Sequence, residues 1–79
     1  MSVNPLINIS LQHCRKFLIS QGCGLKRTTG GHEHLSRADL MRPTTLQSHI
    51  DPVPERIMKQ IIQALNLSKE DFKEIISTI

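Results

Sequence analysis

The chain has 79 residues and a formal net charge of +3. A chain this short supports one small domain, which excludes a large catalytic cleft. It contains no Trp or Tyr and only two Phe, so a stacked-aromatic RNA-binding surface is also excluded. Residues 1–50 carry six bases and two acids, whereas residues 51–79 carry four bases and five acids; the positive half suits an anionic partner, and an ordinary solvated surface explains it equally well.

The first predicted element is a helix over residues 5–21. Asn4-Pro5 is a favourable opening, because Asn accepts a hydrogen bond from a free amide and Pro suits the first helical position. Gly22 predicts that this helix ends with a residue in the left-handed conformation. The apolar residues between them recur at helical spacing: Ile7, Leu11, Cys14, Phe17 and Leu18. His13 is expected on the flank of this helix, at the surface or half-buried.

Three strands are predicted next, over residues 23–29, 32–37 and 44–49. Gly30-Gly31 predicts a tight turn between the first two, and Met41-Arg42-Pro43 predicts a connector before the third. Hairpin connections predict an antiparallel sheet with one face in water. We expect Leu25, Leu35 and Leu46 to point inward, and Lys26 and Thr28 to point outward.

Residues 50–55 predict a stiff link, with Pro54 at the start of a second helix whose core stripe is Ile57, Ile61, Ala64 and Leu65. Ser68 predicts the cap of a final short helix that carries Phe72, Ile75, Ile76 and Ile79. The expected fold class is α+β, with a three-stranded antiparallel sheet, helices packed on one face, and the order α-β-β-β-α plus a short C-terminal helix.

Three of the four histidines are expected on the open face of this sheet. His32 and His34 alternate with Glu33 and Leu35, so the two imidazoles face water if Leu35 faces the core. The third strand is expected to bring His49 to the same face. Glu33 is expected on the opposite face, away from the imidazoles.

Histidines on a basic surface suit proton transfer on an anionic substrate, since imidazole exchanges protons near neutral pH. Cleavage of RNA requires a base for the 2′-hydroxyl, an acid for the leaving 5′-oxygen and groups that stabilise the charged phosphorane. His32 is the candidate acid or base, with Lys26, Arg27 and the amides of Gly30 and Gly31 as stabilisers. DNA lacks the attacking hydroxyl, so this chemistry selects RNA.

Two other interpretations of the histidines stay open at this point. They are ordinary exposed polar residues in the first. In the second, His32, His34 and His49 form a three-imidazole zinc site, although no Cys or acidic residue has ligand-like spacing.

Cys14 and Cys23 form neither a CxxC pair nor a disulfide framework, so both are predicted to be reduced and structural. With no leader pattern and no long apolar run, we expect a cytoplasmic protein that stays off the membrane.

The order of several short motifs resembles the HicA toxins of bacterial and archaeal toxin–antitoxin systems. The resemblance covers residues 10–72 and rests on Gly22-x-x-x-Lys26-Arg27-Thr28-x-Gly30-Gly31-His32-Glu33-His34, then Arg42-Pro43-Thr44-Thr45-Leu46-Gln47-x-His49, then Leu67-Ser68-Lys69-Glu70-Asp71-Phe72. It implies a single HicA-like domain over residues 1–79 with a fold similar to double-stranded-RNA-binding domains. The implied activity is that of an mRNA interferase, an RNA endonuclease that needs no metal or other cofactor and is neutralised by a HicB antitoxin.

The resemblance also assigns roles to residues. His32 takes the place of the family's functional histidine, which follows a Gly-Ser pair, so Gly31 here replaces Ser. Leu35 stands where an aromatic residue is common, and His49 matches a recurrent histidine that contacts RNA or supports the site, as His34 also could. The alternative function is a non-catalytic RNA- or protein-binding module of the same fold, and a more distant one is a structural subunit with no role in nucleic-acid binding. The oligomeric state is left open.

Overall fold

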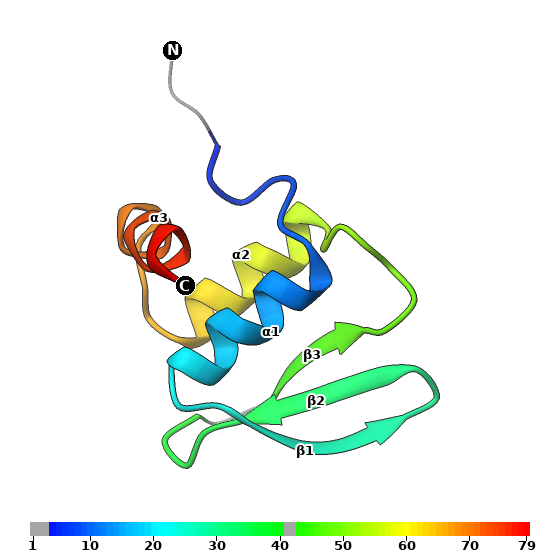
Figure 1. Cartoon of the computed structure of the whole chain (residues 1–79). Helices are drawn as coiled ribbons and strands as arrows, with labels where there is room; N and C mark the ends of the chain where they lie inside the picture. Colours follow the sequence, from blue (N-terminus) through cyan, green and yellow to red (C-terminus); the bar gives the residue numbers. More distant parts are fainter. Residues whose placement is uncertain (1–3, 41–42) are drawn as a thin grey trace.

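The computed structural model describes residues 4–40 and 43–79 (Figure 1). Met41 and Arg42 of the predicted connector lie outside these described residues. Six elements follow in the order α-β-β-β-α-α: α1 (Leu11–Ser20), β1 (Gly24–Thr29), β2 (His32–Ser36), β3 (Thr44–Gln47), α2 (Glu55–Ala64) and α3 (Lys69–Thr78). This order confirms the predicted α+β class.

The sheet is antiparallel with the order β1-β2-β3, so β2 is the central strand. The helices lie on one face of it (Figure 1). Leu35 of β2 and Leu46 of β3 are buried against these helices, as the alternation of apolar and polar residues predicts. His32 and His34, which alternate with Leu35, are half-buried on the other face. The predicted assignment of the two faces of β2 is therefore confirmed.

The start of α1 differs from the prediction, because residues 5–10 are not helical. Asn8 adopts a positive φ of 59°, which an α-helix does not accommodate. Ile9 instead pairs with Val53, whose amide donates to the Ile9 carbonyl at 2.8 Å. The N-cap is Ser10, whose hydroxyl accepts from the His13 amide at 3.1 Å. At the other end, Gly22 has the predicted left-handed conformation, with φ at 85°.

The second and third helices bury a face close to the predicted one. Pro54 is the N-cap of α2, but its buried stripe is Met58, Ile61 and Ile62, followed by Leu65. Ala64 is exposed and Ile57 is half-buried, so the predicted stripe is displaced around the helix. Ser68 and Asp71 form a reciprocal capping box at the start of α3, as the sequence indicates.

One hydrophobic core joins the three helices to the sheet. Cys14 of α1 contacts Met58 of α2 at 3.6 Å between sulfur atoms, and Phe17 of α1 meets Phe72 of α3 edge-on with ring centroids 4.8 Å apart. Among residues 4–40 and 43–79, no helix has both the length and the apolar character required to cross a bilayer.

Strand β1 departs from the prediction because it contains a β-bulge. Leu25 pairs with Leu35, but the next pair along the strands is Arg27 with His34, so Lys26 is the extra residue. All six residues of β1 are exposed, and Leu25, predicted to point inward, retains 59% of its accessible surface. An edge strand beyond the helical layer has little core to contact, which explains the exposure.

Candidate functional site

The candidate site is the sheet face that carries His32 and His34. Residues directly opposite each other on antiparallel strands share a face. His32 pairs with Thr29 of β1 and Gln47 of β3. His34 pairs with Arg27 and Thr45. The central strand thus holds both imidazoles between two rows of polar residues, and the residue opposite His34 on β1 is the basic Arg27.

The bulge changes which basic residue belongs to this face. The predicted alternation placed Lys26 and Thr28 on it, whereas the register places Arg27 and Thr29 opposite the histidines. Thr28 pairs with Glu33 and so shares the other face. Lys26 is exposed at the bulge itself. Of the two predicted phosphate-binding cations, Arg27 is therefore the one aligned with the imidazoles.

The Gly30-Gly31 turn leads directly into His32. Both glycines have positive φ, at 55° and 81°, which is the geometry of a two-residue hairpin turn that glycine adopts without steric cost. The Gly31 carbonyl accepts from the Ser48 amide at 2.7 Å. A Cβ atom on Gly31 would lie 3.4 Å from Nδ1 of His49. The His49 ring therefore lies against Gly31, next in sequence to His32.

His49 was predicted at the end of a strand over residues 44–49, but β3 ends at Gln47. The Ile50 amide donates to the Gln47 carbonyl at 3.2 Å, which makes residues 47–50 a turn. The structure places the His49 ring against Gly31, at the hairpin end of β2. His34 lies two residues further along β2, where its Nδ1 is 3.4 Å from Thr45 Oγ1. His13 is separate: its Nε2 donates to the Ile76 carbonyl of α3 at 3.0 Å.

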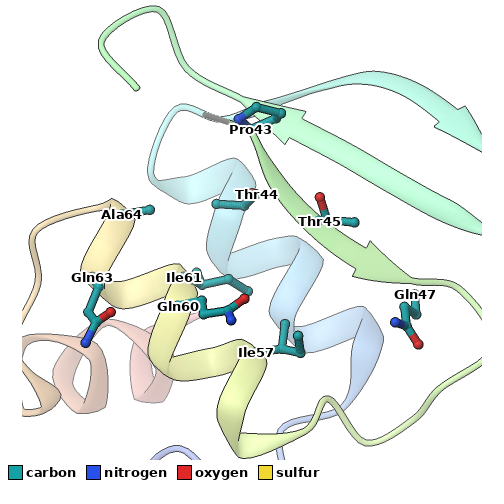
Figure 2. A pocket seen from close by; sticks show the side chains of 9 residues that line it. All are labelled: Pro43, Thr44, Thr45, Gln47, Ile57, Gln60, Ile61, Gln63 and Ala64. Carbon is teal, nitrogen blue, oxygen red and sulfur yellow. The ribbon is translucent and has the colours of Figure 1, made fainter. Parts of the chain in front are cut away.

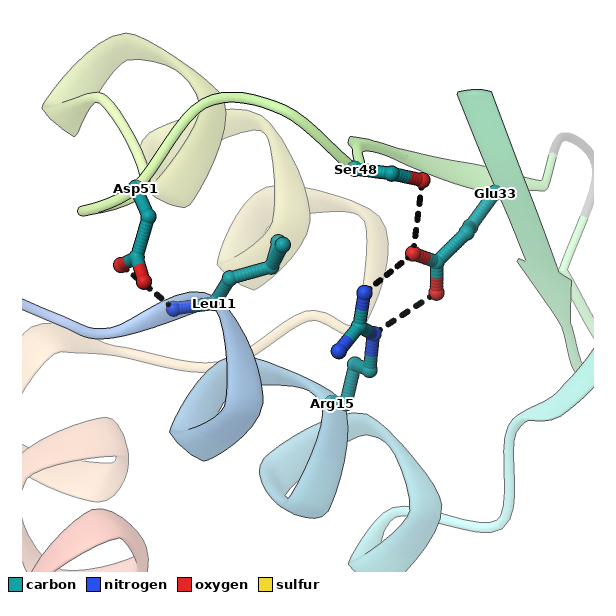
Figure 3. A network of polar contacts seen from close by, with 5 residues as sticks. All are labelled: Leu11, Arg15, Glu33, Ser48 and Asp51. Atoms are coloured by element: carbon teal, nitrogen blue, oxygen red, sulfur yellow. Dashed lines mark hydrogen bonds and ion pairs between the residues drawn. The ribbon is translucent and has the colours of Figure 1, made fainter. Parts of the chain in front are cut away.

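The opposite face of β2 holds an ionic network that the sequence reasoning missed (Figure 3). Glu33 is buried on the helix side of the sheet, with 9% of its surface accessible. The Arg15 Nε donates to Oε1 at 2.8 Å, and Arg15 Nη2 donates to Oε2. The Ser48 hydroxyl donates to the same Oε2 at 2.9 Å. Glu33 does face away from the imidazoles, as predicted, but it has two partners there.

This network sets the charge state of Glu33. The hydrogen bond from the Arg15 guanidinium lowers the pKa of that carboxyl below its ordinary value, burial opposes the shift, and the Ser48 hydroxyl adds to it. Glu33 is thus ionised wherever the protein is folded near neutral pH. The available sequence signal was a carboxylate in phase with the buried Leu35, because a buried charge requires a partner.

The two cysteines are buried and unpaired, which confirms that they are free thiols. Burial raises the pKa of the Cys14 thiol to about 12, and it also raises the pKa of Cys23. Since the thiolate is the reactive form, neither side chain suits a nucleophilic role. Both are structural, as predicted.

A groove of about 590 Å³ lies between β3 and α2 (Figure 2). Thr45 and Gln47 border it on the strand side, and Ile57, Gln60 and Ala64 border it on the helix side. The described residues that line it include no titratable side chain. It therefore lacks the groups for acid–base chemistry, which lie on the neighbouring sheet face.

Among the described residues, no three His, Cys, Asp or Glu side chains gather into a group that could hold a metal ion. The three-imidazole zinc arrangement is therefore not formed by His32, His34 and His49. Comparisons of the chain with protein-family models, with curated proteins and with solved structures found no match. The sequence motifs and the geometry of the histidine face are therefore the observations that bear on function.

Proposed function

We propose that this chain is an mRNA interferase toxin of the HicA kind, an RNA endonuclease in which His32 is the acid–base residue. The observation that carries the proposal is the placement of His32 and His34 on the sheet face opposite the helices. Arg27 of β1 pairs with His34, and the His49 ring lies against Gly31 in the turn before His32. A half-buried imidazole next to the turn amides, on a face that also carries Arg27, provides the groups that phosphodiester cleavage requires.

The proposed reaction is transesterification within the RNA. A base removes the 2′-hydroxyl proton, the freed oxygen attacks the adjacent phosphorus, and an acid protonates the 5′-oxygen as it leaves. His32 takes one of these two roles. Arg27 is aligned to bind a phosphate along the strand from it, and the turn amides stabilise the charge of the phosphorane. The products are a 2′,3′-cyclic phosphate and a 5′-hydroxyl end.

We also propose a protein partner and a cellular location for this toxin. A HicB-type antitoxin would neutralise the chain by covering His32 and the basic face, and both proteins would act in the cytoplasm, where mRNA is found. The support for these two points is the resemblance of the motifs around His32 and His49 to HicA toxins. The fold similar to double-stranded-RNA-binding domains is proposed on the same basis.

The test is incubation of the purified protein with a long mRNA. We expect wild type to cleave it with and without EDTA, and His32→Ala to lose at least about a hundredfold in rate, as for removal of a general acid or base. His13→Gln is the matched control, because His13 lies on α1 and contacts α3. An RNA with 2′-O-methyl groups throughout should bind and remain intact.

Absence of cleavage by wild type would favour the second candidate function, a non-catalytic RNA-binding module. Gly31 lacks the serine hydroxyl of the HicA motif, and its φ of 81° disfavours any side chain there. If wild type binds the mRNA in a salt-sensitive way and leaves it intact, the chain is a non-catalytic RNA-binding module. Cleavage that persists in His32→Ala would instead assign the chemistry to another residue.

A further inference from the structure

Glu33 occupies an unusual place for a carboxylate, because it is buried on the inner face of β2 between two half-buried histidines of the outer face. Glu33 and Thr44 are the buried polar residues of the described chain. Thr44 needs no further explanation, because its hydroxyl donates to the Leu35 carbonyl at 3.0 Å. A buried ion pair adds little net stability over apolar residues of similar size, so its value is more often structural specificity. The contacts of Glu33 indicate which segments of the chain it holds in place.

Ser48 connects Glu33 to the residues on both sides of His32. Its hydroxyl donates to Glu33 Oε2 at 2.9 Å, and its amide donates to the Gly31 carbonyl at 2.7 Å. Ser48 thus bonds to the residue before His32 and to the residue after it. The next residue in the chain is His49, whose ring lies against Gly31. One serine therefore joins the two segments that carry these histidines.

Helix α1 holds the same loop at a second point (Figure 3). The Leu11 amide at the start of α1 donates to Asp51 Oδ1 at 3.0 Å. Arg15 lies one turn later on the same side of the helix and binds Glu33 through two nitrogens. Residues 48–51, which include His49, are therefore bonded to α1 directly at Asp51 and, through Glu33, at Ser48. The helix acts as a rigid support behind the histidine face.

We infer that Arg15, Glu33 and Ser48 are positioning residues that fix the His49 ring beside Gly31 and His32. They do not touch the face that would bind RNA, since they lie on the helix side of β2. Their catalytic consequence rests on the proposed ribonuclease function, in which the imidazoles of His32 and His49 address the same stretch of phosphate backbone. Their structural consequence, the placement of the His49 ring, stands independently of it.

The experiment uses Ser48→Ala, which removes one hydroxyl and leaves the Arg15–Glu33 pair in place. The nuclear Overhauser effect between the His49 ring and the Gly31 α-protons measures the placement of the ring. We expect this signal to be lost in Ser48→Ala, to be recovered in Ser48→Thr, and to persist in Ser36→Ala. Ser36 is the matched control, because it is a half-buried serine at the far end of β2 whose hydroxyl bonds only locally, to the Arg37 carbonyl.

The second readout is RNA cleavage by the same variants. We expect kcat to fall about tenfold or more in Ser48→Ala with KM little changed, because displacement of a reacting group costs rate more than affinity. An unchanged His49–Gly31 signal in Ser48→Ala would overturn the inference. If wild type does not cleave RNA, the proposed function fails, while the Overhauser signals still decide the positioning role.

Discussion

At the scale of single residues, strand β2 separates two kinds of chemistry by its alternation. His32 and His34 lie half-buried on the outer face, and Glu33 faces inward, where Arg15 and Ser48 keep it ionised. Protonation of Glu33 would remove the charge that pairs with the Arg15 guanidinium and convert one of its two acceptor oxygens into a hydroxyl. The stability that the inner face of β2 contributes therefore depends on pH.

Glu33→Gln should change the acid stability of the protein. Because Arg15 lowers the pKa of Glu33, ionised Glu33 contributes stability above its ordinary value of 4.5, and this contribution is lost as the pH falls through the lower folded value. At neutral pH we expect Glu33→Gln to lower the free energy of unfolding by about 1–2 kcal/mol. Urea unfolding of both proteins from pH 7 to pH 3 should show the difference shrinking below pH 4.5.

Asp39→Asn is the control for that experiment. Asp39 also has a lowered pKa, owing mainly to its hydrogen bond with Arg37, but this pair lies at the surface. We expect little change in stability for this variant at any pH. A constant difference between wild type and Glu33→Gln across the titration would show that Glu33 is not the group that titrates.

The candidate site was predictable to the extent that it depends on local alternation. The faces of His32, His34 and Glu33 follow from the two-residue period of a strand once Leu35 is placed inward. The partners of Glu33 do not follow, since Arg15 lies 18 residues away and Ser48 lies 15 residues away. Contacts between distant residues depend on how the elements pack, which periodicity alone does not encode.

At the scale of elements, errors arose where one residue interrupted a regular pattern. The helical spacing of apolar residues extends back to Ile7, before the start of α1. Asn8 has a positive φ, however, which excludes an α-helix at that residue. The bulge at Lys26 likewise shifts the phase of β1 by one residue, which moves Arg27 onto the histidine face. Propensity and period describe averages over a segment, so they miss such single-residue changes. The central strand and the capped start of α3 were predicted well because no interruption occurs in them, whereas α2 was predicted at the right place with its buried stripe displaced.

Asn8→Ala tests the corrected start of α1. In the left-handed conformation an alanine costs about 1 kcal/mol, so the variant should be less stable than wild type. A helix running through residue 8 would give the opposite sign, because Ala is a better helix former than Asn by roughly 0.5 kcal/mol. Denaturant unfolding decides between the two signs. Asn66→Ala is the matched control, because Asn66 has a φ of 58° between α2 and α3 and should also be destabilised.

At the scale of the whole molecule, the two layers differ in what they offer a partner. The sheet face carries Arg27 and the histidines, while α2 and α3 belong to the half of the sequence with a net charge of −1. Under the proposed function, an RNA backbone would therefore bind the sheet layer in preference to α2 and α3. Binding of this kind depends on salt, since each phosphate contact releases counterions.

Arg27→Ala should weaken RNA binding and also make it less sensitive to salt. For one lost contact with single-stranded RNA, the slope of log K against log salt concentration should fall by about 0.7 in magnitude. Fluorescence anisotropy with a labelled RNA across a salt series measures it. Lys73→Ala on α3 is the control of equal charge, since Lys73 is exposed on the helical layer. Equal slopes for the two variants would show that RNA does not bind at the sheet face.

The edge-on contact between Phe17 and Phe72 gives the protein an unusual optical property. These are the only two aromatic rings apart from the histidines, because the chain has no Trp or Tyr. They meet between α1 and α3 and are fully buried. The near-ultraviolet circular dichroism of the protein therefore reports one helix–helix contact and carries no direct signal from the sheet. A spectrum unchanged in Ser48→Ala would mean that α3 stays docked, whatever the loop around His49 does.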